Sequence, residues 1–166
     1  MSAVEHQPML KLIPPVKAGI SSGFGPRHGP ITGVLNEMHS GIDFACALGT
    51  PIISASDGIA YHVGFDKFPA RGVRSFGLFC VVHTIVDADH YMIYYCHLDR
   101  CWIREGLQIE MGMPIGDSGG WYGDSPTDEQ LSKRGSATGA HLHFGVKQYD
   151  ATLANGKWVD PLPMIG

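Results

Sequence analysis

Short runs of apolar residues, each ended by glycine, proline or aspartate, recur along most of this chain. The clearest runs, 77–86 and 90–98, are rich in β-branched and aromatic residues and flank a turn at 87–89, so they predict a β-hairpin. Further short strands are expected at 41–46, 50–55, 59–65 and 140–147, with two more within 106–116. Many short strands with turn residues between them predict a mainly β fold of antiparallel sheet, either a sandwich or a partly open barrel.

Amphipathic helix is nearly absent from the sequence. Residues 21–38 are rich in Gly, Pro and Ser without periodicity, and 117–138 is a long polar stretch in which only about 126–133 has helical character. The chain ends in a proline-rich segment, and proline cannot donate to a β-ladder. We therefore expect loop at 21–38 and no strand after residue 147.

Length and composition describe one globular unit. A chain of 166 residues, 44% hydrophobic and 17% charged, can bury about two thirds of its unfolded surface and needs no covalent staples. We expect an N-terminal lead-in segment at 1–20 and a single domain at 21–166. The net charge is −4 without clusters of Lys or Arg, which argues against nucleic acid or an anionic membrane as partner. We expect the chain to be a monomer.

Targeting signals and cysteine motifs are absent from the sequence. Residues 1–15 contain neither a basic segment nor an apolar run of signal-peptide length, and no segment has the roughly 20 apolar residues of a transmembrane helix. None of the four cysteines belongs to a CxxC motif, so we expect buried, reduced thiols. One alternative stays open, because Cys80 and Cys96 are symmetric about the predicted turn and could form a disulfide.

His141 and His143 carry the strongest local signal for chemistry. Side chains alternate along a strand, so these two imidazoles project from one face. Leu142 and Phe144 then project from the other face, towards a core. Two adjacent imidazoles suit a metal ligand beside a second functional histidine, although an HxH pair alone is a weak indication of metal.

His39 and Asp43 form the second chemical element. In an extended strand they would lie about 13 Å apart and could not share an ion, and Gly41 disfavours a helix. A bend at Gly41 would fold His39 back over Asp43. With the HxH pair, this element supplies two imidazoles and one carboxylate, and hydrolytic zinc sites use three such ligands with a fourth position for water. His141 and His97 are the candidates for an additional base.

The order HxxxD, YxHL and HLHF resembles that of the lysostaphin-type (LytM-like) zinc endopeptidases of peptidoglycan. The similarity extends from about residue 20 to residue 162 and includes the segments 22–27, 49–52, 112–116 and 158–161. It implies a duplicated hybrid motif-like antiparallel β-sheet with a substrate groove lined by loops.

The same resemblance implies a zinc metalloendopeptidase that hydrolyses peptide bonds in peptidoglycan stem peptides or cross-bridges. The family's zinc ligands fall on His39, Asp43 and His143, for one Zn²⁺ per chain. Its two catalytic histidines fall on His97 and His141, which assist the water and stabilise the oxyanion. The expected partners are peptidoglycan peptides, and the expected role is cell wall degradation.

Other functions and the place of action stay open. A zinc carboxypeptidase acting on D-Ala-D-Ala ends would have a longer His-to-Asp spacing. A non-catalytic relative that binds peptidoglycan or activates an amidase would have lost ligands, whereas all five positions are filled here. A metal-binding structural or virion protein that uses this domain mainly to hold on to cell wall is a third alternative, which zinc content without peptide cleavage would favour. Action on the wall, in the periplasm or outside the cell, conflicts with the missing leader. A phage endolysin released through holin pores, a phage-tail component or a removed leader would each explain this bacteriolytic role.

An inserted loop at about 119–138 is the main departure from the family pattern. We expect this loop along the groove, where it could alter which peptide fits. Its Trp121 and Tyr122 could form a stacking platform or be buried beneath the loop. Arg27 could contact a substrate carboxylate or brace a loop through a salt bridge. His28 is expected to be a solvated loop residue.

Overall fold

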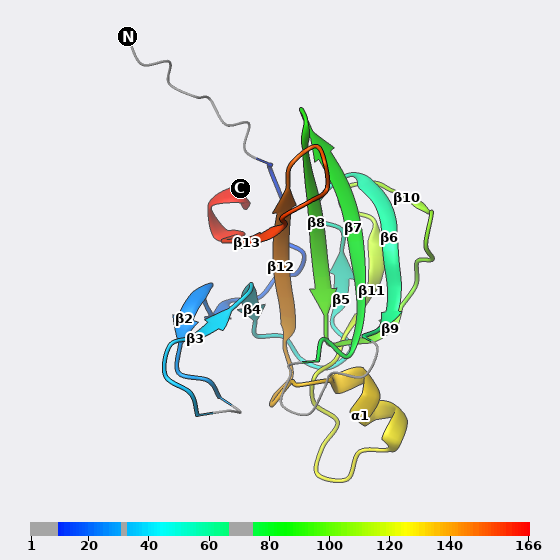
Figure 1. The fold of residues 1–166 in the computed structure, drawn as a ribbon. Coiled ribbons are helices and arrows are strands. Elements are labelled where there is room, and N and C mark those ends of the chain that lie inside the picture. Colours follow the sequence, from blue (N-terminus) through cyan, green and yellow to red (C-terminus); the bar gives the residue numbers. More distant parts are fainter. Residues whose placement is uncertain (1–9, 31–32, 67–74) are drawn as a thin grey trace.

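Two layers of antiparallel sheet dominate the computed structural model, which describes residues 10–30, 33–66 and 75–166 (Figure 1). Across the described ranges, the larger sheet contains β1 (Ile20–Ser22), β4 (Ile42–Phe44), β12 (Leu142–Tyr149), β8 (Asp89–Cys96), β7 (Leu78–Val86), β6 (Gly58–Phe65) and β10 (Gln108–Ile109) in that order, with β13 (Lys157–Val159) paired to β12. The second layer is β5 (Pro51–Ile53), β11 (Pro114–Ser118) and β9 (Leu98–Cys101). β2 (Gly25–Arg27) and β3 (Glu37–His39) form a separate ribbon. The sheets are antiparallel and do not close into a barrel, which agrees with the predicted mainly β fold.

The hydrophobic pattern located most of these elements correctly. The four longest predicted runs correspond to β6, β7, β8 and β12. The predicted helix is α1 (Asp128–Arg134), which a capping box at Thr127 begins, and a 3-10 turn η1 (Leu162–Met164) follows β13. Among the described residues, no helix has the length and apolar character needed to span a membrane.

The predictions of loop at 21–38 and of no strand after residue 147 were wrong. β2 pairs with β3 inside the first segment, and β13 pairs with β12 before Pro161. Each of these strands has three residues. Runs this short show no periodicity, and only the partner strand defines them.

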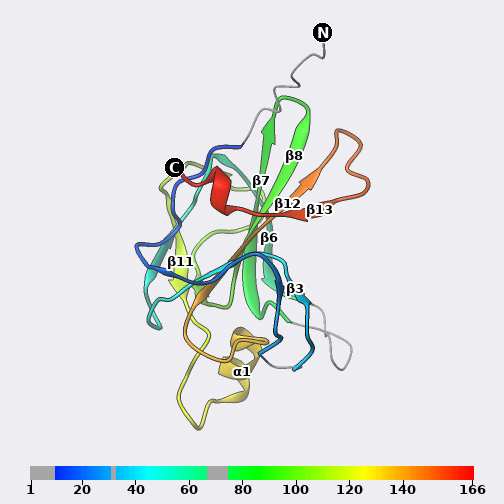
Figure 2. The same cartoon turned by 90° about the vertical axis from the view of Figure 1, so that its left-hand side faces the viewer.

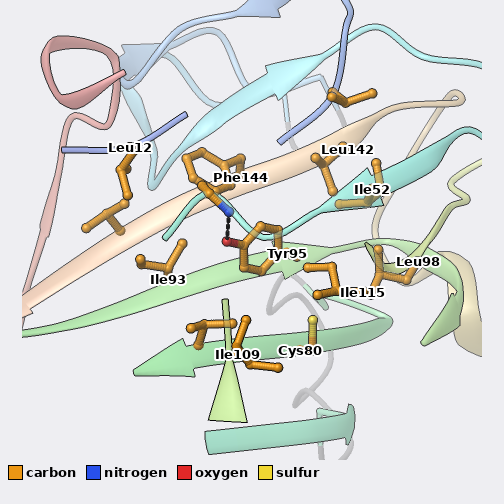
Figure 3. Packing of buried hydrophobic residues seen from close by; sticks show 14 of the residues in the cluster. Leu12, Ile52, Cys80, Ile93, Tyr95, Leu98, Ile109, Ile115, Leu142 and Phe144 are labelled. Carbon is orange, nitrogen blue, oxygen red and sulfur yellow. Dashed lines mark hydrogen bonds between the residues drawn. The ribbon is translucent and has the colours of Figure 1, made fainter. Parts of the chain in front are cut away.

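Alternation along β12 divides its side chains between two environments. Leu142 and Phe144 are fully buried between the two sheets (Figure 3), where the Phe144 ring lies edge-on to Tyr95 at 5.4 Å. The Tyr95 hydroxyl accepts a hydrogen bond from the Ala55 N–H at 2.8 Å. His143 lies between the two core residues in sequence and faces the opposite side of the sheet. The packed core thus fixes the strand that carries the predicted HxH pair.

The N-terminal segment packs onto this core from residue 10 onwards. Leu10, Leu12 and Val16 are buried, and the Leu12 N–H donates to the Met164 carbonyl at 2.8 Å. The first part of the predicted lead-in segment, residues 1–9, lies outside the described residues. A domain boundary at residue 20 stays a prediction.

The four cysteines are free, and the disulfide considered for Cys80 and Cys96 is wrong. The turn between β7 and β8 has two residues instead of three, so Cys80 pairs with Tyr95. This one-residue difference in register places Cys80 in the core between the sheets and Cys96 in a cluster on the opposite face. Both thiols are buried, as expected.

Candidate active site

His39, Asp43 and His143 meet on the face of the large sheet that is turned away from the core. The Nε2 atom of His39 lies 3.1 Å from Oδ1 of Asp43 and 3.0 Å from Nδ1 of His143. That Nδ1 atom is in turn 3.0 Å from the same carboxylate oxygen. Ligands that are each about 2.0–2.2 Å from one zinc ion have similar mutual separations. Within the described ranges, this is the group of side chains that could hold a metal ion.

Strand pairing and one glycine produce this convergence. Asp43 on β4 pairs directly with His143 on β12. His39 ends β3, and the chain bends at Gly41 so that its imidazole returns over Asp43, as the sequence predicted. A side chain at Gly41 would collide with the Phe144 carbonyl group. Glycine therefore allows β4 to approach β12 closely at this point.

Backbone carbonyls determine the tautomers of two histidines. The Nδ1 atom of His39 lies 2.6 Å from the Gly23 carbonyl oxygen, and that of His141 lies 2.9 Å from the Gly139 carbonyl oxygen. Because a carbonyl oxygen only accepts hydrogen bonds, Nδ1 carries a proton in both rings, and the neutral form of each ring has its lone pair on Nε2. The Nε2 atom of His39 faces the ligand cluster, and such a backbone contact is usual behind a metal-ligating histidine. The His141 Nε2 atom lies 3.7 Å from Oδ1 of Asp43.

The local environment favours the protonation states that bind metal. Burial would raise the pKa of Asp43, but hydrogen bonds with His143 and His39 outweigh it and hold the pKa of this carboxyl far below its usual range. Burial lowers the pKa of His143, although Asp43 opposes this shift. The site therefore combines an ionised carboxylate with a neutral imidazole, and these are the forms that coordinate metal ions.

Arg27 forms a salt bridge with the second carboxylate oxygen of Asp43. Its Nη1 atom lies 3.2 Å from Oδ2 of Asp43 and also donates to the Ser22 hydroxyl. Of the two roles considered for Arg27, the structure shows the salt bridge. His28 is exposed, as expected, and it also lines the cavity above the site, with Nε2 3.0 Å from the Gly33 carbonyl oxygen.

His97 and His141 lie beside the three donors. Their ring centroids are 4.9 Å apart, and the His97 ring is 6.0 Å from that of His143. Burial, together with the nearby His141 and His143, lowers the pKa of His97 well below its usual value, so this ring is neutral at physiological pH. The structure thus brings all five predicted residues together, while their individual roles stay predictions.

A cavity of about 570 Å³ opens over these five residues. Two aromatic residues for which no role in the site was predicted, Phe76 and Trp158, also line it. Phe76 stacks on His143 at 5.9 Å between ring centroids and meets Trp158 edge-on at 6.2 Å. Phe76 lies in no motif, and Trp158 begins the segment 158–161 that resembles the family without any role in the site attached to it. Only the sheet topology brings β13 and the segment before β7 to the ligand strand.

The aromatic residues of the inserted loop do not line this cavity. Of the loop's described residues, Ser136 and Thr138 are in its wall, whereas Trp121 is 40% exposed elsewhere. The Tyr122 hydroxyl donates to Oδ1 of Asp99 at 3.1 Å. The stacking-platform alternative is therefore wrong for this cavity, and Tyr122 packs against β9.

A buried His-Asp-His cluster at the floor of a cavity, with two further histidines beside it, is the arrangement of a metallohydrolase site. The profile of Peptidase family M23 matches residues 37–161. The chain belongs to this family, which confirms the resemblance seen in the sequence.

Individual relatives agree with the family assignment. The chain is 30% identical to the Peptidoglycan DD-endopeptidase ShyC of Vibrio cholerae over 126 residues, which is 75% of this chain and 24% of that protein. It is 28% identical to a zinc containing peptidase from Vibrio cholerae of known crystal structure, with a TM-score of 0.62 over 95% of this chain and 40% of that one. The catalytic domain of lysostaphin from Staphylococcus simulans, 24% identical with a TM-score of 0.63 over 88% and 90% of the two chains, shares the fold. The chain spans about a quarter of the length of ShyC and similar curated relatives.

Proposed function

We propose that this chain is a zinc-dependent endopeptidase that hydrolyses peptide bonds in peptidoglycan. The observation that carries the proposal is the convergence of three donor atoms, within 3.1 Å of one another, on a cavity that two further histidines also line. The name of ShyC, a peptidoglycan DD-endopeptidase, supports the reaction and the substrate class.

The donor set fits one Zn²⁺ ion per chain. His39 would bind through Nε2, His143 through Nδ1 and Asp43 through a carboxylate oxygen, and three protein ligands leave a position open on the cavity. Zinc, when bound, polarises a carbonyl group and lowers the pKa of a water molecule. Support for zinc also comes from the zinc containing peptidase with the same fold.

The two additional histidines have complementary capacities. The Nε2 lone pair of His141 lies near Asp43 and can accept a proton from an attacking water. The neutral, buried His97 can donate an N–H to the oxyanion that develops on the substrate carbonyl. We therefore assign His141 as the general base and His97 as the oxyanion-stabilising residue.

The alternatives have less support. The complete donor set argues against a non-catalytic relative that binds peptidoglycan or activates an amidase. A metal-binding structural or virion protein would keep the same donors, and the absence of peptide cleavage would distinguish it. A D-Ala-D-Ala carboxypeptidase is disfavoured because ShyC is named as an endopeptidase. We propose action on the cell wall, in the periplasm or outside the cell. A monomeric state and delivery by holin, phage tail or leader stay predictions.

The test is digestion of purified sacculi, some with direct cross-links and some with glycine bridges. Zinc-loaded protein is expected to release cleaved cross-links that mass spectrometry identifies. Chelation and His143→Ala should both abolish release, and His143→Ala should also lose the bound zinc. His90→Ala, a histidine variant outside the site, serves as the matched control and should cleave normally. A zinc-loaded protein that binds sacculi without cleaving either wall would reject the peptidase in favour of a binding domain.

A further inference from the structure

The inserted segment 119–138 lines the cavity with Ser136 and Thr138, and it also contacts the backbone around His97. We propose that this segment is a positioning element that holds His97 in its catalytic conformation, with the Tyr122–Asp99 hydrogen bond as its anchor. The proposal rests on the peptidase function proposed above, because it assigns a task to one of the catalytic histidines.

His97 has an unfavourable backbone conformation that needs external restraint. Its φ of 62° lies in the left-handed region, where a side chain other than glycine costs of the order of a few RT. Two hydrogen bonds hold it there: its N–H donates to the Phe76 carbonyl at 2.9 Å, and its carbonyl accepts from the Gly119 N–H at 2.8 Å. A strained residue persists only when its surroundings determine it in this way.

The first restraint, at Phe76, is held by the end of the inserted segment together with Asp66, whose carboxylate accepts from the Phe76 N–H at 2.9 Å. The Ser75 N–H donates to the Ser136 hydroxyl at 2.7 Å, and the Ser136 N–H donates back to the Ser75 carbonyl at 2.9 Å. A side chain at Gly77 would collide with the Lys133 carbonyl, so the last turn of α1 lies directly against the backbone that leads into β7. The last turn of α1 and the residues after it thus contact the backbone segment whose Phe76 carbonyl accepts a hydrogen bond from the His97 N–H.

The second restraint, at Gly119, is fixed by the start of the same segment. The Tyr122 hydroxyl donates to Asp99, two residues beyond His97, and Lys133 of α1 lies 3.8 Å from the same carboxylate oxygen. A Cβ atom at Gly119 would lie 2.7 Å from the His97 carbonyl oxygen and 2.8 Å from the Tyr122 hydroxyl. Both ends of the segment therefore converge on the backbone around His97.

The position of α1 in the fold agrees with this task. Figures 1 and 2 show α1 at the end of the large sheet where β8 ends and β12 begins. His97 directly follows β8 and His141 directly precedes β12. Loss of the anchor would let the His97 backbone relax towards ordinary φ values and move its ring away from His141.

A double-mutant cycle tests the proposal. Tyr122→Phe removes one hydroxyl and keeps the ring, and we expect kcat on peptidoglycan to fall about 5- to 10-fold, as the loss of one hydrogen bond allows. KM and the zinc content should stay close to wild type, and Tm should fall by about 1–6 °C, as the loss of one hydrogen bond implies. In a His97→Ala background, the same substitution should have no further effect on kcat, because its influence passes through His97. Tyr61→Phe, on a 62% exposed ring, is the matched control and should change nothing.

Two further measurements separate positioning from general stability. The ring ¹⁵N NMR signals of His97, assigned with His97→Ala, should shift in Tyr122→Phe but not in Tyr61→Phe. Ser136→Ala, at the other end of the segment, should reproduce the loss of kcat at unchanged KM. Unchanged kcat in Tyr122→Phe, or an equal loss in both backgrounds, would overturn the proposal while leaving the peptidase intact. A wild-type protein that cleaves nothing would reject the peptidase itself and this proposal with it.

Discussion

Substitution of Gly41 by alanine is a direct test of how the metal ligands are brought together. The new Cβ atom would lie 2.9 Å from the Phe144 carbonyl carbon and 3.0 Å from the Gly145 Cα atom, whereas ordinary contacts begin at 3.4 Å. The carbonyl oxygen of Phe144 would be closer still. Because all three neighbours are backbone atoms, no side-chain rotation can relieve the collision. β4 and β12 must separate by at least about 0.5 Å, and a displacement of this size is enough for overpacking to lower the stability of the fold.

Two consequences of that separation can be measured. Overpacking of this kind costs about 1–3 kcal/mol, which corresponds to a Tm lower by roughly 2–12 °C for a chain of this size. The same movement carries Asp43 away from His143, because the two residues pair across these strands. Displacements near 1 Å can cost about 100-fold in rate, so we expect a loss of about 10- to 100-fold in peptidoglycan cleavage and weaker zinc binding.

Thermal unfolding of the zinc-free protein and zinc competition with a chelator are the appropriate assays. Gly19→Ala is the matched control, because a Cβ atom at Gly19 meets nothing within 4 Å. Gly19→Ala should retain the Tm and zinc affinity of the wild type. If Gly41→Ala also retained both, the close approach of β4 and β12 would not be what assembles the ligands, and the reasoning would be refuted.

Two other predictions concern the core and the response to pH. Tyr95→Phe should lower the free energy of unfolding in urea by about 1–3 kcal/mol, because the Ala55 N–H would be buried without its acceptor; an unchanged midpoint would contradict this. Burial, with a smaller effect of His90, lowers the pKa of His83 below its usual 6.5, so the folded state binds fewer protons and stability declines as pH falls below 6.5. His83→Asn should make that decline shallower in urea titrations at several pH values between 8 and 5, about the range over which histidine titrates, and an identical pH dependence would count against the assignment.

Local pattern in the sequence was sufficient for the strands that carry Asp43 and His143, whereas it missed β3, which ends at His39. The period-two alternation placed His143 on one face of a strand and Phe144 on the other, because backbone geometry alone enforces that alternation. The bend between His39 and Asp43 was also predictable, since Gly41 disfavours a helix and a straight strand would hold the two side chains too far apart to share an ion. Such inferences succeed because their physical causes act within a few residues.

The grouping of ligands from distant parts of the chain depended on resemblance to a known family. His39 and His143 are 104 positions apart, and no periodicity links residues at that separation. The ordered motifs supplied this link, and the structure then brought His97 and His141 to the same cavity.

Other features were decided only by tertiary structure. The register of β7 and β8 differs by one residue from the predicted one, in which Cys80 would pair with Cys96. The two cysteines therefore lie on opposite faces of the sheet. Turn length and packing set this register, and a strand's own sequence does not. The stacking of Phe76 on His143 likewise has no sequence signal, because it depends on segments that meet only after the sheet has formed. The sequence therefore determined which residues could perform the chemistry, and long-range packing determined how they are held.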